Sequence, residues 1–290
     1  MTELKRRQFL QTVGGAFIAT AATGCGPEGR PAAASPQVPT LPVVPDASTR
    51  FMEMMGLKYP ILQGPAGGVD LAVAVSEAGG LGGLWADSKA DVVGLRARTK
   101  RALWINFAIV KEQERALKPL PAVLEGVAEA GGPVVIHFSW GLPRKENVAA
   151  IRAAKARFAV TVASREGARA AVDVGADYLH CQGLEAGGHL QANRPLDEAL
   201  RQVVEEAKQV PVIAAGGIGD GLGIRRALLA GAAGAQLGTR FLATRECEYR
   251  QEYKDMLLKA KSSDTVATVC FSGNDDDTRR KPPFSGRRWR

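Results

Sequence analysis

Strand-like and helix-like patterns alternate eight times between residues 51 and 273 of this 290-residue chain, and the alternation predicts a TIM barrel, the closed (β/α)8 fold. The length of this segment agrees, because such barrels typically have about 250 residues. A doubly wound open sheet is the competing fold, because it needs no particular number of strands. The dinucleotide-binding fingerprint of that fold is missing, since Gly219 and Gly221 are followed by Ile224 where a third glycine is required.

Short apolar or β-branched runs mark the eight expected strands. They cover residues 59–63, 81–85, 103–107, 134–138, 158–162, 178–182, 211–215 and 235–238. The segments that follow carry small and apolar residues at helical spacing, with helices beginning near residues 69, 91, 117, 144, 164, 196, 221 and 246. Alternation of this kind indicates parallel strands joined by helical crossovers.

The net charge of +8 is concentrated toward the two ends of the chain. Residues 1–50 carry five bases against three acids, and residues 274–290 carry six bases against three acids, which leaves +3 for everything between them. A domain that binds nucleic acid would cluster Lys and Arg on its folded body, among aromatic residues. The charge distribution therefore argues against nucleic acid as a partner.

Residues 1–25 have the pattern of an export signal. Arg6 and Arg7 precede a weakly apolar segment too short for a membrane span of roughly 20 residues, as in a twin-arginine signal. Ala22 to Cys25 resembles a lipobox, in which Cys25 would be lipidated, and ordinary cleavage in the alanine-rich region is the alternative. We therefore expect a protein of the periplasm or cell envelope, with a lipid anchor at Cys25 if the lipobox is used.

The composition suggests how the remaining chain is divided. Residues 26–50 are rich in Pro and Ala and are expected to form an extended linker, residues 51–273 the barrel, and residues 274–290 a disordered basic tail. If Cys25 is lipidated, three of the four cysteines remain and at least one is unpaired. Such sparse cysteines indicate a fold that is stable without disulfides.

The carboxyl ends of TIM-barrel strands open on one face, where loops distant in sequence meet. The loop 63–68 follows the first expected strand there, Asn106 the third, and the turn 182–189 the sixth. Glycine-rich loops 216–221 and 238–240 follow the last two strands, a place where backbone N–H groups and helix N-termini commonly bind phosphate. These loops predict a phosphorylated cofactor. For a single glycine pair a tight turn is the alternative, and it is our expectation for Gly82 and Gly83.

The turn 182–189, with the sequence QGLEAGGH, places His189 directly after two glycines. Glycine allows close approach of the backbone to a flat ligand, and imidazole transfers protons near neutral pH. This pattern indicates an active-site residue, whereas a glycine-rich surface turn with an exposed histidine is the alternative.

Five motifs together resemble the nitronate monooxygenase family, formerly called 2-nitropropane dioxygenases. They are YPILQGP at residues 59–65, EAGGLG at 77–82, QGLEAGGH at 182–189, PVIAAGGI at 211–218 and QLGTRFLAT at 236–244. The resemblance extends from residue 51 to about residue 272, with the motifs in the family order. It implies an FMN-binding TIM barrel that oxidises alkyl nitronates with O2 to a carbonyl compound and nitrite.

The resemblance also assigns roles to individual residues. His189 matches the catalytic histidine of the family. The residues implied to bind FMN are Gln63, Gly64, Pro65 and Ala66 at the flavin ring, Asn106, Gln182 and Gly183 beside it, and Gly216, Gly217, Gly238 and Thr239 at the phosphate.

Other candidate residues have plainer interpretations. His137 is expected to be a packed, hydrogen-bonded core residue, with a contact to the substrate as the alternative, and His180 is expected to fill the barrel. Cys181 alternates with His180 and should face the helices as a structural thiol. The spacing of His, Cys and carboxylate residues predicts no metal site.

Some positions depart from the family pattern. Thr161 stands where relatives more often have Gln or Lys near the flavin, and Leu190 and Gln191 stand where Arg and Gly are common. The chain after the eighth helix is short, so the cover over the substrate is either reduced or supplied by a second subunit, as in a homodimer. Two alternative functions stay open: an NAD(P)H-dependent FMN reductase of the enoyl-reductase type, and a non-catalytic flavin-binding lipoprotein.

Overall fold

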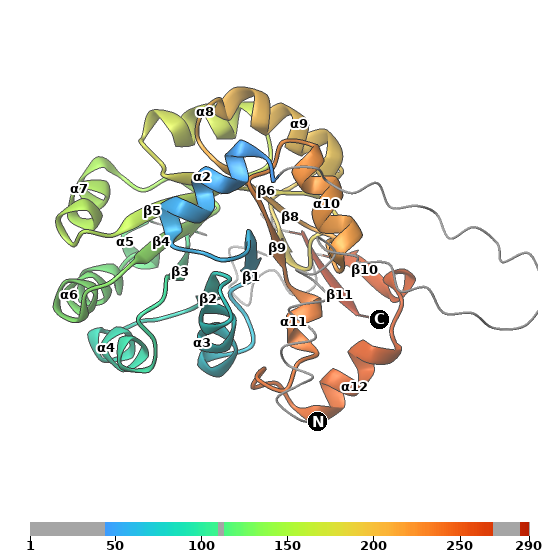
Figure 1. Cartoon of the computed structure of the whole chain (residues 1–290), viewed down its shortest axis with the longest axis horizontal. Coiled ribbons are helices and arrows are strands. Elements are labelled where there is room, and N and C mark those ends of the chain that lie inside the picture. The colour runs from blue at the N-terminus through green and yellow to red at the C-terminus, as the bar shows by residue number, and fades with distance from the viewer. Residues whose placement is uncertain (1–43, 110–112, 269–284, 290) are drawn as a thin grey trace, which may run out of the picture. The chain divides into compact units, whose positions relative to one another are not determined.

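The computed structural model describes residues 44–109, 113–268 and 285–289. Its main sheet has eight parallel strands surrounded by helices (Figure 1). In chain order the strands are β1 (Ile61–Gln63), β2 (Gly82–Leu84), β3 (Leu103–Ala108), β4 (Val134–Ser139), β5 (Arg157–Val162), β6 (Tyr178–Gln182), β8 (Val212–Ala215) and β9 (Gly234–Leu237).

The order of the strands around the sheet is β1-β9-β8-β6-β5-β4-β3-β2. An isolated parallel bridge between Leu62 and Leu81 joins the two ends of this order. Consecutive strands of the chain are thus neighbours all the way round, which is the topology of a TIM barrel. The predicted fold class is confirmed.

Helices follow the strands as the periodicity predicts. They are α3 (Val69–Glu77), α4 (Lys89–Arg98), α5 (Gln113–Ala116), α6 (Leu120–Ala130), α7 (Lys145–Ala153), α8 (Arg165–Asp173), α9 (Leu196–Ala207), α10 (Gly221–Leu229), α11 (Thr239–Leu242) and α12 (Gln251–Lys259). The single helix expected near residue 246 is instead two helices, α11 and α12, on either side of that residue.

A further helix, α2 (Asp46–Met55), covers the amino end of the barrel. Its Phe51 is fully buried, and the ring centroid lies 5.2 Å from that of Tyr178, the first residue of β6. Met55 joins the same cluster of buried residues. The barrel unit therefore includes residues 46–50, which the composition predicts to be linker, because their helix carries part of the core. The expected export signal and residues 26–43 of the linker lie outside the described residues.

Gly82 and Gly83 lie in β2 rather than in a turn, which corrects our expectation. A Cβ atom on Gly83 would lie 2.2 Å from the indole ring of Trp104, which is itself 1% exposed. A Cβ atom on Gly82 would lie 2.0 Å from the carbonyl oxygen of Ala72 in α3. Gly83 therefore leaves room for the indole of Trp104 on the inner face of β2, and Gly82 allows α3 to pack closely on the outer face.

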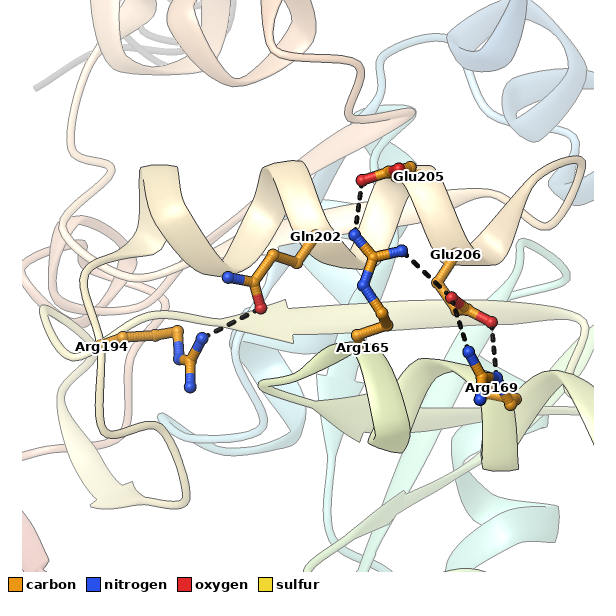
Figure 2. Close-up of polar contacts among 6 residues, drawn as sticks. All are labelled: Arg165, Arg169, Arg194, Gln202, Glu205 and Glu206. Carbon is orange, nitrogen blue, oxygen red and sulfur yellow. Dashed lines mark hydrogen bonds and ion pairs between the residues drawn. The ribbon is translucent and has the colours of Figure 1, made fainter.

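The helices α8 and α9 are joined by ion pairs, drawn in Figure 2. Arg165 lies 2.6 Å from Glu205 and 3.3 Å from Glu206, and Arg169 lies 2.8 Å from Glu206. The hydrogen bond from Arg169 lowers the pKa of Glu206. Strand β6 lies between these two helices in the sequence, so the ion pairs fasten two successive helices of the outer layer to each other.

A second sheet of three strands contains β7 (Gly188–Leu190), β10 (Thr265–Thr268) and β11 (Ser285–Trp289), in the order β10-β11-β7. Its strands are antiparallel, and Gly286 is the register partner of His189. This differs from the expected disordered tail, because residues 285–289 form a strand with partners on both sides. Residues 274–284 and 290 of that tail lie outside the described residues. Within the described ranges, every helix is too short or too polar to span a lipid bilayer.

Candidate functional site at the carboxyl end of the barrel

The loop after β1 is organised by the amide of Gln63, which is 1% exposed. Its Oε1 accepts a hydrogen bond from the N–H of Gly83 at 2.9 Å, and its Nε2 donates to the carbonyl of Ala66 at 2.7 Å and to that of Gly64. The N–H of Gly64 donates to Leu237 at 2.9 Å, which ties the loop to β9. Because both ends of the Gln63 amide bond to backbone groups of this loop and of β2, residues 64–66 are the part of the loop left to meet a ligand.

Three strands side by side contribute a chain of hydrogen bonds below the barrel mouth. Nδ1 of His137 lies 2.6 Å from Oδ1 of Asn106, and its Nε2 lies 2.9 Å from Oγ1 of Thr161. Oγ of Ser139 donates to the same Oδ1 of Asn106 at 3.1 Å. His137 is 2% exposed with both ring nitrogens engaged, which confirms the prediction of a packed, hydrogen-bonded histidine.

A second buried histidine lies beside the first. The ring centroids of His137 and His180 are 4.4 Å apart, and the indole of Trp104 packs against both, at 4.8 and 5.2 Å. Nδ1 of His180 is 2.5 Å from Oε1 of Gln236 on β9. His180 therefore fills the barrel, as expected. Trp104 and Gln236 were not singled out from the sequence, although each lies two residues before a candidate and so shares its strand face.

Burial keeps both imidazoles neutral. Desolvation lowers the pKa of His180 to about 4, partly offset by the hydrogen bond with Gln236. Desolvation also lowers the pKa of His137 well below its ordinary value, and the neighbouring His180 adds to the effect. The thiol of Cys181 is buried and its pKa is raised to about 12 by desolvation, as suits the expected structural role.

The depressed pKa of His180 predicts that the protein loses stability in mild acid. The folded form titrates near pH 4 and the unfolded form near 6.5, so between these values the unfolded state binds a proton that the folded state does not. The contribution of His180 to the free energy of unfolding is therefore fully present above about pH 6.5 and is lost as the pH is lowered toward 4. Between pH 7 and pH 5 this loss is about 2 kcal/mol. Urea unfolding at the two pH values measures the loss. His180→Gln should shrink the difference, and an unchanged difference would contradict the assignment to His180.

The turn that carries His189 is held by the side chain of Gln182. Its Nε2 donates to the carbonyl of His189 at 3.1 Å, and its Oε1 accepts from the N–H of Gln191 at 2.8 Å. The expected loop is in part a strand, because residues 188–190 form β7. His189 is exposed, and its ring meets the indole of Trp140 edge to face at 5.6 Å.

Gln191 links its own turn to the segment after β4 and to the strand β5. Its Oε1 accepts from the N–H of Trp140, after β4, at 3.0 Å, and its Nε2 donates to the carbonyl of Thr161, on β5, at 2.8 Å. Trp140 has a positive φ of 60°, uncommon for a bulky residue, and this conformation is held in part by that bond. The position at which the sequence departs from the family pattern thus fastens the turn of His189 to the strands beside it.

The loop after β6 packs on the loop after β8. The N–H of Gly183 donates to the carbonyl of Ala215 at 2.9 Å, and a Cβ atom on Gly183 would lie 2.4 Å from Leu196. Gly216 and Gly217 follow with φ values of 130° and 66°, which favour glycine. Further along, Arg194 donates to Gln202 at 3.0 Å (Figure 2) and fixes the return of the loop to α9.

The ends of β8 and β9 offer backbone donors for a phosphate. The N–H groups of Gly217 and Thr239 have no hydrogen-bond acceptor among the described residues. A Cβ atom on Gly238 would have no neighbour within 4 Å, so the space beside it is open. Free N–H groups next to open space on adjacent strands suit an anionic group.

The donors and acceptors of the mouth therefore fit FMN, the cofactor that the resemblance implies. The amide of Asn106 and the hydroxyl of Thr161 suit a flat ring with hydrogen-bonding edges, and the glycine loops suit its phosphate. Two surface hollows of the described part of the chain, one around Glu77 to Arg101 and one beside the end of α2, contain none of the candidate residues. In the described ranges no three His, Cys, Asp or Glu side chains group in a way that could hold a metal ion.

Residues 99–280 match a family model described as nitronate monooxygenase. A nitronate monooxygenase of Pseudomonas aeruginosa is 32% identical over 272 residues, which cover 77% of each chain. Among solved structures, a nitroalkane oxidase from Streptomyces ansochromogenes superposes with a TM-score of 0.68 at 30% identity, covering 83% of this chain and 78% of that one. FabK from Thermotoga maritima superposes with a TM-score of 0.70 at 31% identity, covering 83% and 74%.

Proposed function

Because the chain belongs to the nitronate monooxygenase family, a family of flavin oxidoreductases, we propose that it binds FMN and oxidises alkyl nitronates with O2 to a carbonyl compound and nitrite. The observation that carries this proposal is the meeting of Asn106, Thr161, Gln182 and the His189 turn at one end of the barrel. The likeness to a structure described as a nitroalkane oxidase supports nitro compounds as the substrate class.

The chain would hold FMN with two groups of residues. The backbone at Gly217 and Thr239 would bind the phosphate, with Gly216 and Gly238 giving the loops their shape. Gly64, Pro65 and Ala66 on one side, and Gln182 and Gly183 on the other, would flank the ring. FMN, when bound, supplies the electron transfer, so the protein's part is to orient the substrate and to move a proton.

His189 would handle that proton. Its imidazole is exposed at the mouth and is placed by two contacts, the edge-to-face packing on Trp140 and the hydrogen bond from Gln182 to its carbonyl. A neutral imidazole can take the α-proton of a nitroalkane near physiological pH. A nitronate has already lost this proton, so the step is needed for one form of the substrate only.

Two measurements on the purified full chain test the proposal. Mass spectrometry of the released yellow ligand should identify FMN, and ethyl nitronate should cause oxygen uptake with formation of nitrite. If NADH, and not the nitronate, bleaches the flavin without oxygen, the chain is instead an NAD(P)H-dependent FMN reductase of the enoyl-reductase type. If neither donor reduces a bound flavin, it is a non-catalytic flavin-binding protein.

The proposed location in the periplasm or cell envelope rests on the twin-arginine pattern and on the lipobox at Cys25, both outside the described residues. Fractionation of cells that express the full chain tests it. Recovery of the protein in the cytoplasmic fraction alone would contradict export, and recovery in the soluble periplasmic fraction would contradict the lipid anchor.

A further inference from the structure

We infer that His137 is a positioning residue for the flavin site, an inference that rests on the proposed function for the identity of the ligand. His137 holds Asn106 and Thr161 in the orientation that they present at the barrel mouth. The residue thus does more than fill the core, although it does not touch the ligand itself.

The geometry places His137 between two groups of the mouth. Asn106 on β3 is its register partner, and Thr161 lies two residues beyond Ala159, its partner on β5. Side chains on alternate residues share a face, so all three side chains lie on the inner side of the barrel. The two ring nitrogens reach one neighbour each, at 2.6 Å to Asn106 and 2.9 Å to Thr161.

These contacts determine which hydrogen-bonding groups Asn106 and Thr161 have left to donate or accept. Oδ1 of Asn106 is an acceptor, so Nδ1 of His137 carries the proton and Nε2 accepts from the hydroxyl of Thr161. Ser139 donates to the same Oδ1 at 3.1 Å. Both of these bonds use Oδ1 of Asn106, so its Nδ2 amide group is available to a ligand. His137 therefore makes Asn106 a donor, and Thr161 an acceptor, toward the mouth.

The surroundings of His137 explain why its role is indirect. It is 2% exposed and packs against the rings of both Trp104 and His180. A phenylalanine would pack in nearly the same volume, so packing alone does not require an imidazole here. The two nitrogens that reach Asn106 and Thr161 are what distinguishes histidine from phenylalanine at this position.

A double-mutant cycle measured by FMN binding separates the two roles. His137→Phe and Thr161→Val are each expected to raise the FMN dissociation constant about five- to tenfold, the loss expected for roughly one hydrogen bond. If His137 acts through Thr161, the double variant should bind FMN little more weakly than either single variant. Quenching of FMN fluorescence by the apoprotein, obtained from the full-length holoenzyme, gives the constants.

Tyr178→Phe is the matched control. Tyr178 is fully buried on β6 near α2, and its hydroxyl has no hydrogen-bond partner in the described part of the chain. Removing that hydroxyl changes the barrel interior by one oxygen atom and should leave FMN binding unchanged. The melting temperature of each apoprotein, recorded separately, shows whether a weaker affinity merely follows a loss of stability.

His137→Gln tests whether FMN affinity is rescued by a side chain that can hydrogen-bond. It also keeps the inference testable if the phenylalanine variant does not fold. A glutamine amide can reach Thr161, so this variant should regain most of the affinity that His137→Phe loses. Wild-type affinity in His137→Phe, or strictly additive losses in the cycle, would overturn the inference while leaving the proposed function intact. Failure of the wild-type chain to bind FMN would overturn the proposed function as well.

Discussion

Replacement of His189 by alanine is expected to lower the turnover of a neutral nitroalkane by about 10²- to 10⁴-fold, and that of the corresponding nitronate much less. The imidazole is exposed, and the backbone carbonyl of His189 accepts a hydrogen bond from Gln182. The substitution therefore removes a proton acceptor without opening a cavity in the core. Rates of nitrite formation from nitroethane and from ethyl nitronate, measured on the same enzyme preparation, give the two losses.

His189→Gln is the control for this prediction. Glutamine keeps a polar side chain against Trp140 but cannot accept a proton at neutral pH, so it should resemble alanine on the nitroalkane. Both variants should retain the bound FMN of the wild type. Equal losses on the two substrates would refute the role as a base and leave His189 as a residue that binds the substrate.

The strands and helices of the barrel could be predicted because each produces its own local periodicity. At each of the eight strands of the barrel, the predicted first and last residues lie within two residues of the observed ones. At β1 the expected start at residue 59 is too early, since Pro60 has no N–H group to donate and the N–H of Tyr59 donates to Gly79 outside the sheet. The gathering of candidate loops at one end then follows from the fold alone.

Contacts between side chains of different strands could not be predicted in the same way. Alternation places His180 and Gln236 on inner faces, but only the curvature of the closed barrel decides that these two side chains meet. Similarly, the resemblance assigns Gln63 to the flavin ring, but it does not predict that the amide of this residue bonds to Gly83 on β2 and to Ala66 in its own loop. Sequence patterns identify the residues of a face more readily than their partners.

The strand β11 was missed for a related reason. Its segment is charged and contains prolines upstream, a composition typical of disorder. The strand exists through its pairing with β7 and β10, both distant in the sequence, and no pattern within the segment encodes those partners. Its register beside His189 means that the end of the chain belongs to the surroundings of the candidate site.

Gly82→Ala is expected to reduce the free energy of unfolding by about 3 kcal/mol, near the upper end of the usual cost of overpacking. The new Cβ atom would lie 2.0 Å from the carbonyl oxygen of Ala72 and 2.8 Å from Oγ of Ser76. Ala72 contributes a backbone atom of α3, so relief requires the whole helix to move away from β2. Ser76 would be disturbed as well, because its hydroxyl accepts from the N–H of Gly82 at 3.0 Å and donates to Ala102 at 2.8 Å.

Gly94→Ala is the matched control, with the same added methyl group on a site without obstruction. Gly94 lies within α4, and a Cβ atom there would have no neighbour within 4 Å. Alanine favours the helix over glycine, so this variant should gain about 0.5 to 1 kcal/mol. Urea unfolding of both variants at pH 7 gives the comparison. Wild-type stability in Gly82→Ala would mean that α3 can leave β2 at no cost, which contradicts the close packing that requires glycine in this strand.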